Sequence, residues 1–146
     1  MTATVFVDTN VLIYALDEGD PQKLRAARAW RKELWKSRRG RLSFQVLQEF
    51  YAKVLQKWPI ARNDARAEVR DLMAWDPVAV DAGVLELGWK IQDRYHLSFW
   101  DALIVAAAKS AGCRYLLTED LQHGQQLDGV TVLSPFLSDP ASLAES

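Results

Sequence analysis

The sequence has few of the residues that several common kinds of protein chemistry need. One cysteine and two histidines among 146 residues exclude an internal disulfide and argue against a site of Cys and His ligands. Cys113 falls between an expected helix and an expected strand and is interpreted as a small buried residue. The chain has no Gly-rich phosphate loop, no Gly-x-Ser-x-Gly and no Cys/His pair, so neither nucleoside triphosphate binding nor covalent hydrolysis is indicated.

Long apolar segments are also missing. The longest apolar run, Ala102 to Ala108, is far shorter than the ~20 residues that span a membrane. The N-terminus shows no basic region followed by an apolar stretch and a cleavage site, so no signal peptide is expected. These features predict a cytoplasmic protein without a membrane segment. We expect one domain over residues 1–137, followed by a frayed tail over 138–146.

Basic residues are unevenly distributed in a chain whose net charge is −1. The stretch from Lys23 to Arg41 holds nine of the 18 Lys and Arg residues and one acid, Glu33, and no Lys or Arg follows Arg114. One interpretation is a solvated helix face; the other is a surface for phosphates or an acidic partner. The candidate phosphate contacts in it are Arg38, Arg39 and Arg41.

Apolar periodicity and turn signals predict alternating strands and helices. The expected strands are 2–7, 41–43, 77–80, 114–117 and 130–133, and the expected helices are 11–16, 21–37, 44–58, 63–75, 81–96 and 99–111. The helix from Phe99 is apolar almost all round, which indicates a buried element. Strands separated by helices predict an α/β fold in which helices cover both faces of a central parallel sheet.

Four acidic residues lie at or near the ends of these elements. Asp8 follows the first strand, Glu49 lies early in a helix, Asp101 lies in the first turn of the helix from Phe99, and Asp120 follows the strand 114–117. In a doubly wound sheet, the carboxyl ends of strands and the N-termini of helices meet at one edge. We therefore expect the four carboxylates to lie near one another.

Each acid also has a purely structural interpretation, which the sequence leaves open. Asp8 or Asn10 is suited to cap the helix that follows it. Asp101 fits a capping box with Ser98, in which the two residues bond each other's backbone N–H groups. Glu49 is four residues before Lys53 and is placed to form an ion pair with it on an exposed helix edge.

A set of four carboxylates points to a divalent cation. They do not stay ionised together unless a positive charge lies between them. Ligands that are all oxygens favour Mg²⁺ or Mn²⁺ over zinc, and such ions typically serve phosphoryl chemistry. Without these four acids the net charge of −1 becomes +3, which suits a polyanionic substrate.

Four motifs in this order resemble the PIN-domain family, and in particular its VapC-type ribonuclease toxins. They are Val7-Asp8-Thr9-Asn10, Gln48-Glu49, Phe99-Trp100-Asp101-Ala102 and Leu117-Thr118-Glu119-Asp120. The resemblance implies that the catalytic, metal-binding acids are Asp8, Glu49, Asp101 and Asp120, with Glu119 as a possible substitute for the last. The supporting polar residues are Thr9, Asn10 and Thr118. We assign no catalytic role to His123.

The resemblance also implies a fold and a function. The fold is a PIN-like three-layer α/β/α arrangement, and the activity is cleavage of single-stranded or looped RNA with Mg²⁺ or Mn²⁺. Partners implied are a second copy of the chain and a cognate antitoxin that binds near the active site. The predicted function is therefore a metal-dependent endoribonuclease toxin of a toxin–antitoxin pair. The alternatives are a housekeeping RNA-processing nuclease of the same fold, a non-catalytic binding module and, least favoured, a small-molecule phosphatase.

Overall fold

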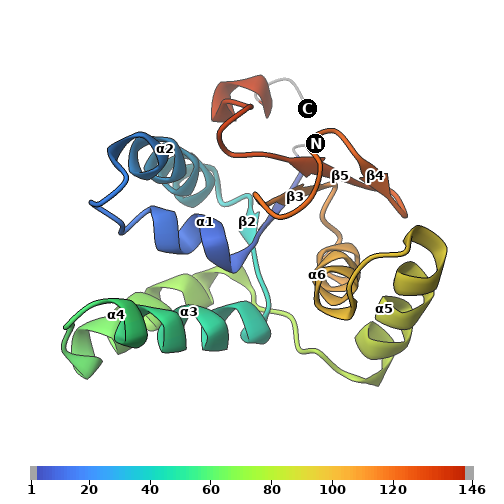
Figure 1. Cartoon of the computed structure of the whole chain (residues 1–146), viewed down its shortest axis with the longest axis horizontal. Coiled ribbons are helices and arrows are strands. Elements are labelled where there is room, and N and C mark those ends of the chain that lie inside the picture. Colours follow the sequence, from blue (N-terminus) through green and yellow to red (C-terminus); the bar gives the residue numbers. More distant parts are fainter. Residues whose placement is uncertain (1–2, 144–146) are drawn as a thin grey trace.

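The computed structural model describes residues 3–143 and contains alternating strands and helices (Figure 1). In chain order the elements are β1 (Val5–Val7), α1 (Thr9–Tyr14), α2 (Pro21–Ser37), β2 (Gly40–Arg41), α3 (Phe44–Lys57), α4 (Arg62–Leu72), the 3₁₀ helix η1 (Met73–Trp75), α5 (Ala82–Tyr95), α6 (Phe99–Ser110), β3 (Tyr115–Leu117), β4 (Gln126–Leu127), β5 (Val130–Leu133) and the 3₁₀ helix η2 (Pro140–Leu143).

The strands form one sheet in the order β2-β1-β3-β5-β4. β1 is parallel to β2 and β3, and β3 is parallel to β5, whereas β4 is antiparallel to β5 at the edge. The register aligns Val5 with Gly40 on one side and Val7 with Leu117 on the other. The predicted α/β fold with a central parallel sheet is therefore confirmed, apart from the antiparallel edge strand β4.

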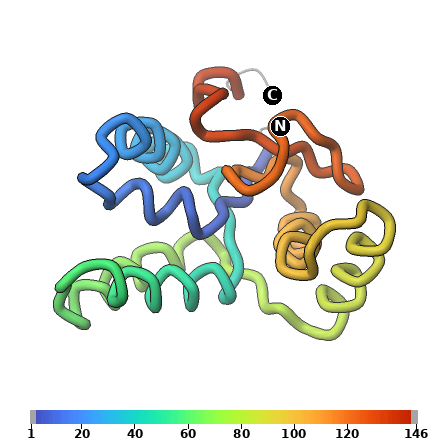
Figure 2. The backbone as a smooth tube through the Cα atoms, in the orientation of Figure 1, coloured from blue at the N-terminus to red at the C-terminus, as the bar shows by residue number. Residues whose placement is uncertain are grey.

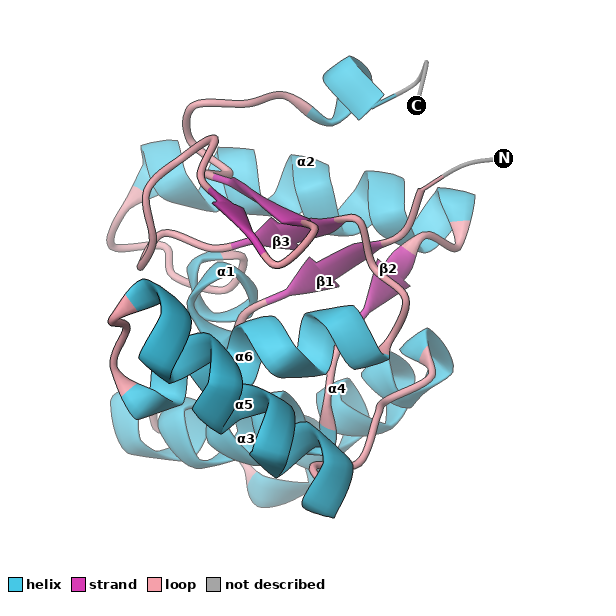
Figure 3. Cartoon of the chain, turned by 90° about the vertical axis from the view of Figure 1, so that its right-hand side faces the viewer, coloured by secondary structure: helices cyan, strands magenta, loops and turns pink. Residues whose placement is uncertain are grey.

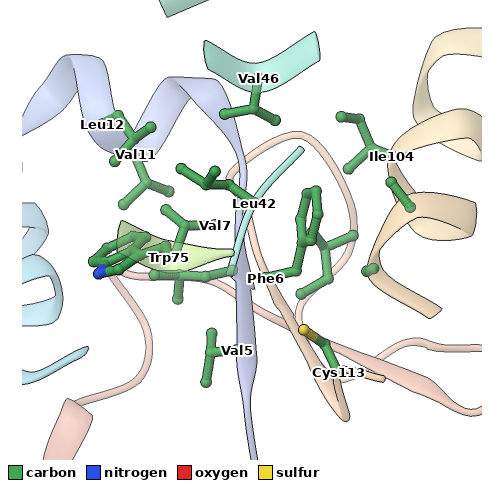
Figure 4. Close-up of a cluster of buried hydrophobic side chains, with 14 of the residues drawn as sticks. Val5, Phe6, Val7, Val11, Leu12, Leu42, Val46, Trp75, Ile104 and Cys113 are labelled. Atoms are coloured by element: carbon green, nitrogen blue, oxygen red, sulfur yellow. The ribbon is translucent and has the colours of Figure 1, made fainter. Parts of the chain in front are cut away.

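β1 lies in the centre of the hydrophobic core. All three of its residues are buried, as expected for a strand whose two faces are both covered. Side chains of Val5 and Val7 point to one face and that of Phe6 to the other, where Ile104 of α6 lies (Figure 4). Short runs of β-branched and aromatic residues thus fold here as interior strands.

Helices cover both faces of the sheet. Figure 3 shows the strands between α2 on one side and α6 on the other, with α5 packed outside α6. Every residue of α6 from Ala102 to Ala108 is buried, which confirms the prediction from its apolar sequence. α5 and α6 pack closely at Gly88, where a Cβ would lie 3.3 Å from Cδ1 of Leu103. Within residues 3–143, no helix is long and apolar enough to cross a membrane.

Four helices begin after a side-chain cap. Asp20, Ser43, Asp81 and Ser98 each accept a backbone N–H from the first turn of the following helix, although Ser43 was expected in the strand 41–43. The predicted first residues of two helices were wrong. α1 begins at Thr9, because Asp8 is its cap, and α4 begins at Arg62 after Ala61, so Asn63 lies inside the helix.

The strand predicted over 77–80 does not form. Only Val78 pairs, through an isolated parallel bridge to Ser43. Its neighbour β2 ends at Arg41, and the chain turns into α3 at Phe44, so a longer strand has no partner to bond. The edge strand β4, which pairs with β5, was not predicted, because its two residues carry no alternating pattern.

The segment after residue 137 is packed rather than frayed as far as residue 143. Trp30 Nε1 donates a hydrogen bond to the carbonyl of Ser138, and Leu143 in η2 is only 4% exposed. Figure 2 shows this red segment lying beside the blue helix α2. The predicted tail is therefore wrong for residues 138–143, and its last three residues lie outside the described ones.

Candidate active site at the carboxyl edge of the sheet

The sheet has its topological switch point between β1 and β3. From β1 the chain crosses to β2 on one side, and it later returns to β3 on the other side. In open α/β sheets, ligands bind at the carboxyl ends of the strands at such a point. Asp8 directly follows β1, and Thr118 directly follows β3. α6 runs back along the sheet before β3, so its first turn, with Asp101, is at the same edge.

Asp8 is a buried carboxylate at this edge, 7% exposed. Its Oδ1 accepts the backbone N–H of Thr9 at 2.7 Å, and its Oδ2 accepts the hydroxyl of Thr118 at 2.9 Å. Burial raises the pKa of Asp8 to about 6, and the charges of Asp120 and Glu49 act in the same direction, against these hydrogen bonds. The ionised carboxylate is thus destabilised where it stands, and a cation would stabilise it.

Asn10 connects Asp8 to Asp120. Its Nδ2 lies 3.1 Å from Oδ2 of Asp120, 3.2 Å from Oγ1 of Thr118 and 3.4 Å from Oδ2 of Asp8. Its Oδ1 faces the backbone N–H of Glu119 at 3.4 Å. The amide of Asn10 therefore lies where oxygens from three residues meet, two of them carboxylates.

Glu49 is connected to Asp8 through Thr9, the residue that follows Asp8 in the chain. Its Oε2 accepts the hydroxyl of Thr9 at 3.1 Å, and its Oε1 accepts Nε2 of Gln45 at 3.0 Å. The alternative ion pair with Lys53 is not among those formed by residues 3–143. Gln45 was not predicted as a site residue, although its position four residues before Glu49 on one helix face was the available signal.

Asp101 contributes only its backbone to the helix cap. Its N–H bonds Oγ of Ser98 at 3.2 Å, but the reciprocal bond from Ser98 to the carboxylate is not formed. Within residues 3–143, the carboxylate of Asp101 forms no hydrogen bond or ion pair, either with the other three acids or with any other group. The capping interpretation thus accounts for its position but not for its charge.

Glu119 and Asp120 have different surroundings. Lys23 Nζ lies 2.6 Å from Oε1 of Glu119, so that carboxylate is neutralised by an ion pair. Asp120 instead faces Asn10, and its backbone N–H bonds Oγ1 of Thr118 at 3.1 Å. The geometry therefore favours Asp120 as the acid of the site. Lys23 belonged to the basic cluster in the sequence, but its link to Glu119 was not predicted.

The oxygen donors suit Mg²⁺ or Mn²⁺ in type but are not gathered into a finished site. Within residues 3–143, no three Asp, Glu, His or Cys side chains lie in an arrangement that holds a metal ion. None of the ion pairs in the described part of the chain involves Asp8, Glu49, Asp101 or Asp120. The buried charge of Asp8 therefore lacks a cationic side chain, and the metal set of four acids stays a prediction.

The three arginines proposed as RNA contacts do not reach this edge. The prediction that Arg39 contacts RNA was wrong, because its side chain is only 7% exposed. Its Nε donates to the carbonyl of Ala3 and its Nη1 to the carbonyl of Leu143, so Arg39 is a structural residue. Arg41 folds back onto the carbonyls of Arg38 and Gly40. Because Arg38 precedes β2, these groups gather at the amino edge of the sheet, opposite the acids.

Both histidines have structural positions. His96 is the C-cap of α5 in the left-handed conformation, with φ of 57°. His123 Nδ1 accepts the backbone N–H of Ser134 at 3.0 Å and so ties the turn after β3 to the end of β5. Neither contact involves the acids of the carboxyl edge.

Comparison with known proteins identifies the family. The model of the PIN domain matches residues 5–125. A VapBC from Salmonella typhimurium bound to DNA is similar over 91% of this chain and 98% of its own, with TM-score 0.65 and 16% identity. A toxin–antitoxin complex from Klebsiella pneumoniae is similar over 90% of this chain and 98% of its own, with TM-score 0.64 and 20% identity.

A third similar structure is VapC20 from Mycobacterium tuberculosis, described as a Sarcin-Ricin loop cleaving toxin. It covers 77% of this chain and 87% of its own, with TM-score 0.59 and 24% identity. A search of curated proteins finds no significant match. The family model covers most of the chain, including Asp8, Glu49, Asp101 and Asp120, and the fold agrees with it: the chain belongs to the PIN-domain family.

Proposed function

We propose that the protein is an endoribonuclease that depends on Mg²⁺ or Mn²⁺ and acts as the toxin of a toxin–antitoxin pair. The observation that carries the proposal is the surroundings of Asp8. This buried carboxylate lies at the switch point of the sheet, near the charges of Asp120 and Glu49, and no basic side chain pairs with it in the described part of the chain. Such a site is suited to a divalent cation.

Asp8 and Asp120 would hold the cation, with Thr118 beside them. Their oxygens now face the amide of Asn10, and these are the oxygens that a cation would take over. Glu49, held by Thr9 and Gln45, would orient a water molecule, and the free carboxylate of Asp101 would complete the set. When bound, the ion polarises a phosphate and lowers the pKa of a bound water, which is the chemistry that phosphodiester hydrolysis requires.

Membership of the PIN-domain family supports the nuclease activity. The similar structures from Klebsiella pneumoniae and Salmonella typhimurium are toxin–antitoxin assemblies, and VapC20 is described as a Sarcin-Ricin loop cleaving toxin. From these we propose RNA as the substrate class and an antitoxin protein as the partner. A homodimer and a cytoplasmic location remain predictions, and light scattering of the purified chain would test the first.

The decisive experiment is cleavage of a labelled single-stranded RNA with Mg²⁺ or Mn²⁺, beside a chelator control. Asp120→Asn and Asp101→Asn should each reduce the rate on the order of a hundredfold, because each removes a charge from the site. Asp93→Asn, on the exposed side of α5, is the matched control and should cut like the wild type. Circular dichroism would establish that all variants are folded.

The outcomes separate the alternatives. Equal cutting by all variants would mean that the activity is a contaminant or that the acids are structural. No cutting by a wild type that also fails to bind Mn²⁺ would favour a non-catalytic module. Growth arrest on expression, relieved by a small co-purifying protein, is expected for a toxin, whereas a housekeeping nuclease should cause no such arrest.

A further inference from the structure

Lys23 occupies an electrostatically unfavourable place in its own helix. It lies in the first turn of α2, in which no acidic residue follows the N-cap Asp20, whose side chain accepts the backbone N–H of Lys23. The helix dipole is positive at this end and favours acids over bases. A lysine here is thus held by contacts outside the helix, and these contacts lead to the candidate active site.

The ammonium of Lys23 is enclosed by three side chains from distant parts of the sequence. Nζ lies 2.6 Å from Oε1 of Glu119 and 3.3 Å from the hydroxyl of Tyr14. It also lies 4.6 Å from the ring centre of Tyr14 and 5.1 Å from that of Phe136. Those two rings meet edge to face at 5.4 Å. The position of Nζ is therefore set by an anion and by two aromatic rings.

The ion pair ends one residue away from Asp120. Two contacts of the segment 118–120 are to the polar site: Thr118 donates its hydroxyl to Asp8, and the backbone N–H of Glu119 faces Asn10. Both would rearrange when a ligand enters. Two further contacts come from outside the site: the carbonyl of Leu133 accepts the backbone N–H of Thr118, and Lys23 Nζ bonds the side chain of Glu119. Lys23 is the cation among these partners.

We propose that Lys23 is a positioning residue: its ion pair with Glu119 fixes the segment 118–120 so that Asp120 faces Asn10 and Asp8. The proposal deepens the proposed nuclease function and rests on it where catalysis is concerned. It also gives the two neighbouring acids separate tasks. Glu119 anchors the segment to α2, and Asp120 is free to serve the site.

The ion pair is suited to position the segment rather than to stabilise the fold. Both side chains are one-third exposed, and partly exposed ion pairs contribute little to global stability. Removing Lys23 should therefore leave the protein folded while loosening the segment 118–120. A second ion pair provides a control, because Lys57 Nζ lies 2.7 Å from Oδ2 of Asp17, with the lysine 48% and the aspartate 14% exposed.

The test compares Lys23→Met with Lys57→Met, since methionine keeps the apolar stem and removes the charge. In Lys23→Met we expect hydrogen exchange of the Asp120 amide to speed up on the order of tenfold. Mn²⁺ binding followed by calorimetry should weaken, and kcat for RNA cleavage should fall on the order of tenfold at an unchanged KM. Lys57→Met should match the wild type in all three measurements.

The charge-swapped variant Lys23→Glu/Glu119→Lys checks that the pair itself is responsible. It should restore most of the Mn²⁺ affinity and kcat that either single change removes. The inference is overturned if Lys23→Met behaves like Lys57→Met, if the swap restores nothing, or if only KM rises, because a rise in KM alone would make Lys23 a phosphate contact. If the wild type neither cuts RNA nor binds Mn²⁺, the proposed function fails, while amide exchange at Asp120 still decides the role of Lys23.

Discussion

The side-chain nitrogen of Asn10 lies 3.1 Å from Oδ2 of Asp120, although the two residues are 110 positions apart in the sequence. The same nitrogen lies 3.2 Å from Oγ1 of Thr118. This one amide joins the start of α1 to the segment after β3 and lies between the carboxylates of Asp8 and Asp120. The arrangement leads to predictions about charge at the carboxyl edge, and the packing beneath it leads to others.

Asn10→Ala should destabilise the protein when no divalent cation is present. The substitution removes the donor that Asp8 and Asp120 share, which costs about 1 kcal/mol in the free energy of unfolding. Thermal unfolding in a chelator measures the loss, and excess Mn²⁺ should reverse most of it. A variant that loses stability equally with and without Mn²⁺ would contradict this role.

Asp8→Asn should change how stability depends on pH. The pKa of Asp8 is about 6 in the folded protein and 3.8 as the ordinary value, so the folded protein keeps the proton on this carboxyl up to a higher pH than the unfolded chain does. The free energy of unfolding therefore falls as pH rises from about 4 to about 6, by up to about 3 kcal/mol. Urea unfolding in a chelator should show that the free energy of unfolding of Asp8→Asn increases relative to that of the wild type between about pH 4 and about pH 6.

Mn²⁺ should then reverse the order of the two proteins at pH 7. The wild type gains stability from a ligand that binds its folded state, whereas Asp8→Asn has lost the buried charge that attracts the ion. The measurement is the midpoint of thermal unfolding against Mn²⁺ concentration. Parallel shifts in both proteins would mean that Asp8 does not hold the cation.

Arg39→Ala should be strongly destabilising. The buried guanidinium bonds the carbonyls of Ala3 and Leu143, so truncation leaves a cavity and removes a donor from each. We expect a loss of about 2–4 kcal/mol in the free energy of unfolding. Arg38→Ala, at an exposed neighbouring position, should stay within about 0.5 kcal/mol, and similar losses in both would refute the structural role of Arg39.

Gly40→Ala should destabilise the protein by crowding Trp75. A Cβ at Gly40 would lie 2.7 Å from Cε2 of that ring, which is 3% exposed and fixed in the core. Overpacking of this kind costs about 1–3 kcal/mol. The control is Gly83→Ala in the first turn of α5, where the nearest atom is 3.5 Å away, and calorimetric unfolding of both should show a loss only for Gly40.

Local features of this protein followed from the sequence because their causes are local. The caps at Asp20 and Ser98 and the burial of α6 depend on residues within a turn or two of each other. The strand at 77–80 failed for the opposite reason. A strand needs a partner of matching length, and β2 is too short to provide one.

The sequence by itself determined the fold class and the placement of Asp8, Asp101 and Asp120 at the ends of elements. The period of the apolar residues indicates the strands and helices, and the capping residues indicate where the helices begin. Only the tertiary structure decided that Asn10 bonds Asp120, that Lys23 forms an ion pair with Glu119 and that Arg39 is buried. These contacts depend on the strand order, which brings the ends of β1 and β3 together. Pairing between distant segments is chosen by packing of the whole core, and no local pattern specifies it.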